Sequence, residues 1–187
     1  MHQTRRRLPH LDAIGQPQFI TFRLHNSLPD HRVFPPSNLT SGQAFLAVDR
    51  LLDLARSGPT FLKQPSIAQL VQTSLKQGVA LAHYVLHSWV IMPNHIHLLL
   101  TPQVILAKLL CSLKATTAQQ ANRILARGGV PFWQHESYDH LVRDESEATR
   151  IISYIEGNPV KAGLASKPED YPWSSATSNR KSISLAG

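Results

Sequence analysis

The sequence contains almost no cysteine and no long apolar run. Cys111 is the single cysteine among 187 residues, so no internal disulfide can form and a cysteine-rich zinc site is excluded. No apolar run is long enough to span a membrane, and the N-terminal residues MHQTRRR lack the apolar centre of a signal peptide. We therefore expect a cytoplasmic protein without a membrane segment.

Acidic residues are absent from a long internal stretch. Between Leu54 and His135 the chain has no Asp or Glu, but it has seven Lys and Arg residues. The rest of the chain carries equal numbers of basic and acidic residues, so the net charge of +7 comes from this stretch. Such a positive field suits a polyanion such as nucleic acid, although a basic surface that maintains solubility would have the same composition.

Hydrophobic periodicity and turn residues predict a mixture of strands and helices. The expected strands cover 18–24, 79–92, 95–101 and 136–143, and the expected helices cover 41–57, 65–77, 104–127 and 144–157. This order predicts an α+β fold, a ferredoxin-like antiparallel sheet with helices packed mainly on one face. Residues 1–187 are expected to form one domain, with a basic N-terminal arm over 1–15 and an irregular C-terminal tail over 165–187.

Two histidines stand two residues apart in the strand-like run WVIMPNHIHLLL, residues 89–100. Alternate side chains leave the same face of a strand, so His95 and His97 point the same way and Ile96 points into the opposite layer. In an apolar layer each imidazole needs a partner for its ring nitrogens, and two neighbouring imidazoles can share a divalent metal. The pair therefore favours a metal site, although this pattern also occurs in zinc hydrolases and as simple packing.

The last predicted helix places Tyr154 and Asn158 four residues apart, on one face. The amide oxygen of Asn158 is a suitable hard ligand for Mg²⁺ or Mn²⁺ beside His95 and His97. Tyr154 alone fits a half-buried core position. Next to a metal-bound phosphate its phenol would be a nucleophile, and we expect the positive field and the metal to lower its pKa from the ordinary value of about 10.

The basic residues of the helix over 104–127 fall into two groups. Lys108, Arg123 and Arg127 share a polar arc, which fits contact with a phosphate backbone and equally fits an ordinary solvated face. Lys114 falls in the apolar arc, where its ammonium must reach solvent or find a partner, so it is the stronger candidate for a site residue.

A zinc hydrolase is a competing reading of the histidine pair. It would need an acidic base, and the segment around the histidines contains no carboxylate. Glu136, Asp139 and His140 on the next predicted strand could join the site, but a surface role fits them equally well.

Three motifs carry a resemblance to a known family: MPNHIHLLL at 92–100, FWQ at 132–134 and YIEGNPVKAGL at 154–164. Together with RRLPH at 6–10, ITFRL at 20–24 and YPWSSA at 171–176, they resemble the REP-associated tyrosine transposases, which are relatives of the bacterial single-strand HUH transposases. The resemblance covers nearly the whole chain, and residues 31–60 match least.

The resemblance implies metal-dependent cleavage of single-stranded DNA at a short palindromic hairpin, through a 5′-phosphotyrosine intermediate. It implies that His95, His97 and Asn158 bind Mg²⁺ or Mn²⁺ and that Tyr154 is the nucleophile. Gly157 departs mildly from the family pattern and could loosen the helix near Asn158.

The implied partner is a hairpin from repetitive extragenic palindromes, bound by a nucleoid-associated protein that is more readily a monomer than a dimer. The candidate DNA-contacting residues are Arg5, Arg6, Arg7, Lys108, Lys114, Arg123, Arg127 and Lys161. The alternative is a non-catalytic protein that binds the hairpin without cutting it.

Overall fold

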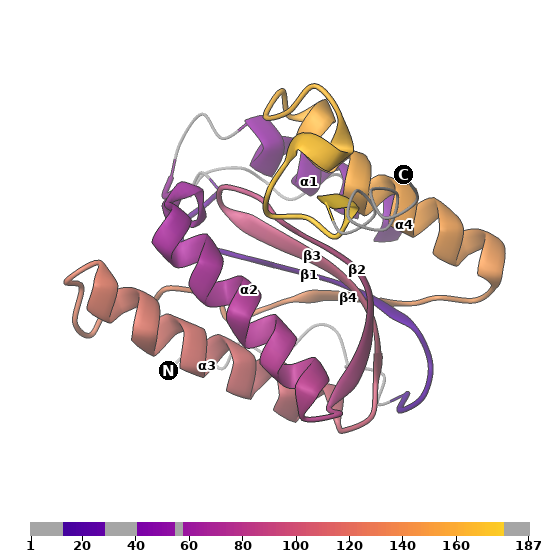
Figure 1. The fold of residues 1–187 in the computed structure, drawn as a ribbon, viewed down its shortest axis with the longest axis horizontal. Coiled ribbons are helices and arrows are strands. Elements are labelled where there is room, and N and C mark those ends of the chain that lie inside the picture. Colours follow the sequence, from indigo (N-terminus) through magenta and orange to yellow (C-terminus); the bar gives the residue numbers. More distant parts are fainter. Residues whose placement is uncertain (1–12, 29–40, 55–57, 178–187) are drawn as a thin grey trace, which may run out of the picture.

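The computed structural model describes residues 13–28, 41–54 and 58–177, and its centre is a four-stranded antiparallel sheet. The strands are β1 (Gln18–Arg23), β2 (Tyr84–Ile91), β3 (His95–Pro102) and β4 (Tyr138–Leu141). They lie in the order β2-β3-β1-β4 (Figure 1). This order confirms the predicted α+β fold with a ferredoxin-like sheet.

Within the described ranges, four α-helices cover the two faces of this sheet: α1 (Ser41–Leu54), α2 (Pro65–Ala80), α3 (Leu106–Ile124) and α4 (Glu145–Lys161). Two short 3₁₀ helices, η1 (Phe61–Lys63) and η2 (Pro168–Asp170), flank them. Helices α2 and α3 pack side by side on one face, and α4 packs on the other face with α1 nearby (Figure 1). The expected one-sided arrangement holds for α2 and α3, whereas α4 follows the last strand and covers the opposite face.

The pleat of β3 divides the core into two layers. Ile96, Leu98 and Leu100 are fully or almost fully buried and pack with the apolar side chains of α2 and α3. Leu99 points the other way and packs with Ile155 of α4. His95 and His97 therefore face α4, and the α2–α3 layer lies behind them.

Two helices extend beyond their predicted ends. Helix α2 passes through Gly78, which was expected to follow it, and β2 consequently starts at Tyr84 instead of Val79. Helix α4 passes through Gly157 and Pro159 to Lys161, because the loss of one backbone donor at a proline does not stop a helix that is packed along its length. Its start follows the sequence prediction, since the Asp144 side chain accepts a hydrogen bond of 2.7 Å from the Glu147 amide.

The described part of the C-terminal tail is ordered along the outer edge of β2. The Ile91 amide donates to the Trp173 carbonyl at 2.8 Å, and the Ser175 amide donates to the Trp89 carbonyl at 2.9 Å. The Tyr171 hydroxyl donates to the Ile91 carbonyl at 2.9 Å. This pairing covers backbone groups that an edge strand would otherwise expose. Among the described residues, no helix is long and apolar enough to cross a membrane.

Two helical glycines differ in the space around them, and this difference predicts opposite effects of an alanine substitution. A Cβ on Gly78 would lie 2.5 Å from the buried Tyr84 ring, whose hydroxyl donates to the Leu75 carbonyl at 2.7 Å. A Cβ on Gly157 would meet no atom within 4 Å. We expect Gly78→Ala to lower the free energy of unfolding by roughly 1–3 kcal/mol and Gly157→Ala to raise it by about 0.5–1 kcal/mol. Urea titration followed by circular dichroism checks both, and a stabilised Gly78→Ala protein would contradict the packing described for Tyr84.

Candidate metal and tyrosine site

The two histidines of β3 converge on one buried point. His95 and His97 are both 0% exposed, and their Nε2 atoms lie 3.1 Å apart. Their common direction follows from the two-residue period of the strand, as the sequence predicted. The close approach of two ring nitrogens in a buried layer is the arrangement expected around a shared cation.

The other ring nitrogen of each histidine is fixed by a side chain. The Nδ1 atom of His95 lies 2.7 Å from Oδ1 of Asn94, which is itself held because its Nδ2 donates to the Leu52 carbonyl at 3.0 Å. Since Asn94 Oδ1 can only accept, His95 carries its proton on Nδ1 and presents a lone pair at Nε2. The Nδ1 atom of His97 lies 2.7 Å from the Thr21 hydroxyl. Such outer partners commonly orient metal-binding imidazoles.

Asp49 of α1 completes the group, and the sequence analysis did not identify it. Its Oδ1 lies 3.1 Å from Nε2 of His97 and 3.6 Å from Nε2 of His95, and the side chain is 2% exposed. The sequence contained one signal for it: Asp49 lies four residues after Phe45 and three before Leu52, on the apolar side of the predicted helix. An acidic residue on that side needs a buried partner.

Helix α4 brings Tyr154 and Asn158 to the same carboxylate. The Tyr154 hydroxyl donates to Oδ2 of Asp49, and Nδ2 of Asn158 lies 3.5 Å from the same oxygen. Asn158 is fully buried, and its Oδ1 has no hydrogen-bond partner within the described part of the chain. The predicted common face of Tyr154 and Asn158 is therefore present, one helical turn apart.

A second carboxylate lies at the edge of the site. Oδ1 of Asp53, one turn after Asp49 on α1, is 3.8 Å from Nε2 of His95 and has no hydrogen-bond partner among the described residues. Burial and the neighbouring charge of Asp49 raise the pKa of Asp53 to about 7.

The protonation states follow from burial and from this close packing. Burial, with a smaller effect of His97, lowers the pKa of His95 to about 3, so this imidazole is neutral at pH 7. Burial alone would raise the pKa of Asp49, but the two imidazoles and the Tyr154 hydroxyl hold that pKa below its usual range. Burial and the charge of Asp49 raise the pKa of Tyr154 above its ordinary value. The side chains of the site do not lower the pKa of Tyr154, as we expected a positive field to do, because the carboxylate of Asp49 lies next to the phenol. The lowering expected from a bound metal stays a prediction.

The donor set fits a divalent cation. Asp49, His95 and His97 offer ligand atoms that all lie within 4.8 Å of one another. Oδ1 of Asp49 and Oδ1 of Asn158 are buried oxygens without hydrogen-bond partners in the described ranges, and a cation would satisfy both. Two nitrogen and two oxygen donors suit Mn²⁺ or Mg²⁺ and do not exclude Zn²⁺. Asp49 of α1 supplies the carboxylate that the histidine segment itself lacks.

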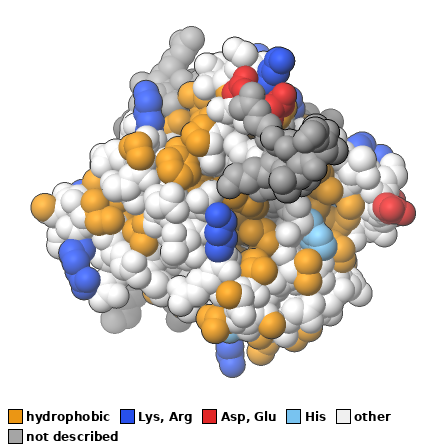
Figure 2. All heavy atoms as spheres, viewed as in Figure 1, with side chains coloured by type: hydrophobic (Ala, Val, Ile, Leu, Met, Phe, Trp, Pro, Cys, Tyr) orange, Lys and Arg blue, Asp and Glu red, His pale blue; other side chains and the backbone are white. Residues whose placement is uncertain are grey.

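The basic helices lie apart from this site. Lys76 of α2 and Lys108 and Arg123 of α3 belong to the layer on the opposite face of the sheet from the histidines. Figure 2 shows that layer, with Lys and Arg side chains spread over it and acidic side chains near its edges. The described basic residues of α2 and α3 therefore do not surround the histidines. Lys161 of α4 lies near the site, with its Nζ 4.6 Å from the centre of the Tyr154 ring.

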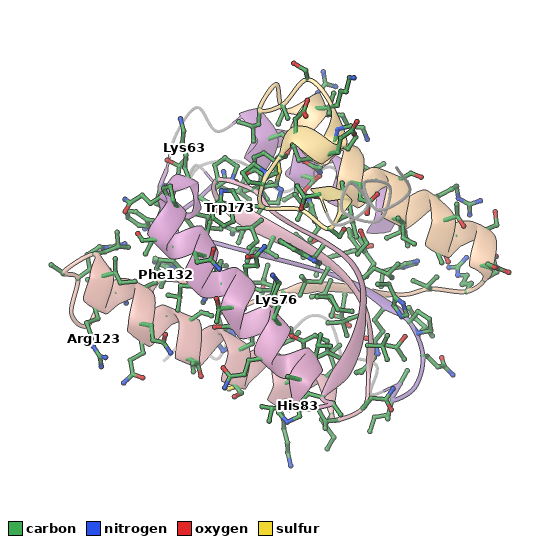
Figure 3. The ribbon with its side chains drawn as sticks, in the orientation of Figure 1. Lys63, Lys76, His83, Arg123, Phe132 and Trp173 are labelled. Carbon is green, nitrogen blue, oxygen red and sulfur yellow. The ribbon has the colours of Figure 1, made fainter. Side chains whose placement is uncertain are left out.

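The remaining candidate DNA-contacting residues have different environments. Lys108 and Arg123 are exposed, and the Arg123 side chain extends outward near the C-terminal end of α3 (Figure 3). Arg127 follows α3, which ends earlier than predicted, and its guanidinium lies 4.4 Å from the centre of the Phe61 ring. Lys114 has the partners that its place in the apolar arc requires, because its Nζ donates to the His135 carbonyl at 2.9 Å and to the Ser137 hydroxyl at 3.0 Å. Arg5, Arg6 and Arg7 lie outside the described residues.

His140, one of the alternative site residues, is engaged elsewhere. Its Nε2 lies 3.0 Å from Oε1 of Glu147 at the start of α4. Glu136 interacts electrostatically with Arg23 at the end of β1. The cluster of Asp49, His95 and His97 therefore forms without either of them.

Comparisons with known proteins support the resemblance seen in the motifs. No protein-family model matches the chain. Over 43 residues, which make up 23% of this chain, it is 40% identical to a protein of Haemophilus influenzae named "Putative REP-associated tyrosine transposase". That match spans 24% of the relative's length.

The fold is similar to a solved structure described as a REP-associated tyrosine transposase bound to a REP hairpin, with a TM-score of 0.60 and 18% identity. The similarity covers 97% of this chain and 86% of that one. The fold and site define a ferredoxin-like domain with a buried Asp-His-His cluster beside a helical tyrosine. The predicted resemblance to REP-associated tyrosine transposases is confirmed.

Cation binding at this cluster predicts a metal-dependent gain in stability. At a Mn²⁺ concentration 100 times the Kd, the thermal midpoint should rise by roughly 5–10 °C, since ligand that binds only the folded state stabilises it. Asp49→Asn should reduce this rise, whereas Glu145→Gln, which removes an exposed carboxylate at the start of α4, should keep it. Differential scanning calorimetry with and without Mn²⁺ measures the shift, and Mn²⁺ EPR reports binding directly. An equal rise in both variants would place the ion elsewhere.

Proposed function

We propose that this chain is a REP-associated tyrosine transposase: a metal-dependent, single-stranded DNA endonuclease and strand-transferase that recognises a palindromic hairpin. The main support is the convergence of three distant segments on one buried point. Asp49 from α1, His95 and His97 from β3, and Tyr154 and Asn158 from α4 meet there. A metal-binding cluster without the tyrosine would fit many hydrolases, and the tyrosine without the cluster would fit a core position.

The proposed ligands are His95, His97, Asn158 and, in addition to the sequence prediction, Asp49. A bound Mg²⁺ or Mn²⁺ would polarise the scissile phosphate and withdraw charge from its oxygens. Oδ1 of Asp49 faces the imidazoles, and Oδ2 accepts the hydrogen bond of the Tyr154 hydroxyl. One carboxylate can therefore contribute a ligand atom and hold the proton of the nucleophile.

The chemical step uses Tyr154 as the nucleophile. As the phenol oxygen forms a bond to phosphorus, it gives up its hydroxyl proton along the hydrogen bond to Oδ2 of Asp49, and the proton passes on to solvent. The bond between phosphorus and the 3′ oxygen of the preceding nucleotide breaks, and that oxygen takes a proton from water and leaves as a 3′ hydroxyl. The product is a 5′-phosphotyrosine, which conserves a phosphodiester, so a second 3′ hydroxyl can displace the tyrosine and rejoin the strand.

A DNA hairpin is the proposed partner because the solved structure with the similar fold is described as bound to one. The basic residues predicted to contact DNA remain part of this proposal. Among the candidates that the structure describes, Lys161 lies next to the tyrosine, with its Nζ over the ring. Monomeric state, cytoplasmic location and nucleoid association also remain predictions from the sequence.

A non-catalytic hairpin-binding protein is the second candidate. One observation favours it: the Tyr154 hydroxyl is hydrogen bonded to a carboxylate, and its pKa is raised, so the phenol is protonated in this arrangement. Cleavage assays separate the two candidates.

Tyr154→Phe tests the nucleophile. With Mn²⁺ and an end-labelled, single-stranded palindrome, the wild-type protein should give a protein–DNA band that survives denaturation, and the variant should give none. The ring and its packing against Phe19 are retained, so Mn²⁺ binding and folding should persist. Tyr138→Phe, a change on β4 near the same phenylalanine, is the matched control and should keep the band. A covalent band in Tyr154→Phe would disprove the assigned nucleophile.

The double substitution of His95 and His97 by Ala tests the metal requirement. We expect cleavage to fall below detection while hairpin affinity changes by less than threefold, because the imidazoles are buried beneath the surface that meets DNA. Band-shift titration and cleavage are measured on the same substrate, with thermal melting to confirm folding. If wild-type protein binds tightly but never cleaves, with either metal and several flanking sequences, the binding-protein candidate is correct.

A further inference from the structure

The motif YPWSSA at 171–176 has no part in the proposed chemistry, yet it lies beside the helix that carries the tyrosine. Its backbone follows the outer edge of β2, where Val90 and Ser174 form an antiparallel bridge. Tyr171 packs in the same apolar cluster as Ile155 of α4. In Figure 1 this segment, drawn in yellow, lies next to α4 and to the edge of β2. The motif therefore contacts both the sheet and the helix.

The Ser175 hydroxyl joins this segment to both neighbours. Its Oγ lies 3.0 Å from Oε1 of Glu156 on α4 and 3.0 Å from the hydroxyl of Ser88, a fully buried residue of β2. The Trp89 amide donates to the same Oγ at 3.1 Å. A hydroxyl has one proton and an ionised carboxylate can only accept, so Ser175 donates to Glu156 and accepts from Ser88 and the Trp89 amide. This charge-assisted bond ties α4 to the edge of the sheet.

Glu156 and Tyr154 leave α4 on nearly opposite sides, about 160° apart around the helix axis. Between them Ile155 is fully buried against the sheet. The helix is therefore held on three sides: Tyr154 by Asp49 of α1, Ile155 by the sheet and Glu156 by the C-terminal segment.

This part of α4 needs such support because its own backbone is weak there. Pro159 has no N–H, so the Ile155 carbonyl lacks its ordinary helical donor. Gly157 lies between them and adds no side-chain contact. The apolar packing of Ile155 has no preferred direction, whereas the bond to Glu156 restricts both distance and angle.

The orientation of α4 matters because small rotations become large displacements at the site. A rotation of about 10° moves a group about 6 Å from the helix axis by about 1 Å. A misplacement of about 1 Å can lower the rate of a reaction by roughly 100-fold. A contact on the far side of the helix can therefore control how well the Tyr154 hydroxyl is aimed.

We propose that Ser175 is a positioning residue: through Glu156 it fixes the rotation of α4 and so directs the Tyr154 hydroxyl at the cluster of Asp49, His95 and His97. Neither Ser175 nor Glu156 reaches the reacting atoms, and both act through the helix. The effect on cleavage rests on the proposed function, whereas the effect on the position of Tyr154 does not.

The test breaks the bond from either side. Ser175→Ala and Glu156→Ala remove it, and Glu156→Gln keeps an oxygen that accepts from the hydroxyl. Thr177→Val is the matched control, because the Thr177 hydroxyl belongs to the same segment but bonds to the Ser174 carbonyl and not to α4. Thermal melting establishes that each variant folds. If Ser175→Ala does not fold, the comparison of Glu156→Ala with Glu156→Gln tests the same bond.

The first readout follows the tyrosine without DNA. In protein labelled with 3-fluorotyrosine, ¹⁹F NMR resolves the four tyrosines of the chain, and Tyr154→Phe identifies the signal of Tyr154. We expect Ser175→Ala and Glu156→Ala to shift or broaden this signal and to leave that of Tyr138 on β4 unchanged. Glu156→Gln and Thr177→Val should keep the wild-type signal.

The second readout is the single-turnover rate of hairpin cleavage with saturating protein and Mn²⁺. We expect a loss of roughly 10-fold in each alanine variant, with hairpin affinity and the Mn²⁺-dependent thermal shift unchanged, since the metal ligands are retained. The double variant should lose no more than either single one, because each single change already breaks the bond. Glu156→Gln should recover most of the rate.

Two results would overturn the proposal. If both alanine variants fold and keep the wild-type Tyr154 signal, the bond does not set the rotation of α4. If Glu156→Gln is as impaired as Glu156→Ala, or Thr177→Val is impaired equally, the effect comes from a general loosening of the segment. A wild-type protein that binds hairpins but never cleaves them rejects the proposed function, and the Tyr154 signal then decides this inference by itself.

Discussion

The buried carboxylate of Asp49 is the group on which the candidate site depends. A carboxylate that is 2% exposed is strongly destabilising unless its charge is compensated. Here Oδ1 faces two imidazoles and Oδ2 accepts a phenol hydroxyl, so both oxygens have polar neighbours from other elements. Because α1, β3 and α4 are far apart in the sequence, these contacts form only when the sheet and both helices are assembled. The stability of that assembly and the geometry of the site therefore rest on the same contacts.

The candidate metal site and most of the basic helical residues lie on opposite faces of the sheet. Residues of one stretch, 54–135, provide the histidines on one face of the sheet and most of the basic helical surface on the other. A charge excess along the sequence therefore does not imply a positive field at the site. The carboxylate of Asp49 accepts the hydrogen bond of the Tyr154 hydroxyl, and the ammonium of Lys161 lies over the Tyr154 ring. In the proposed function, one surface attracts DNA over a long range, and a different surface holds the reacting phosphate.

The parts of the site that could be predicted from sequence are those set by local periodicity. The two-residue spacing of His95 and His97 and the four-residue spacing of Tyr154 and Asn158 fix a common face, whatever the rest of the fold does. Asp49 could not be placed in this way, because its contact with His97 joins residues that are 48 positions apart. The predicted helix ends were wrong where tertiary packing outweighed a local signal. At Gly78 the glycine was expected to follow the helix, but it packs inside the helix against the Tyr84 ring.

Asp49 also bears on which nucleophile the site would use. With a carboxylate and two histidines, a metal-activated water is chemically possible, as in zinc hydrolases. A hydrolase, however, needs its base to face a water molecule. In this structure Oδ2 of Asp49 is hydrogen bonded to the Tyr154 hydroxyl, and Asn158 approaches the same oxygen at 3.5 Å. The carboxylate of the site is thus directed at the phenol. In the proposed function, this arrangement favours tyrosine over water as the attacking group.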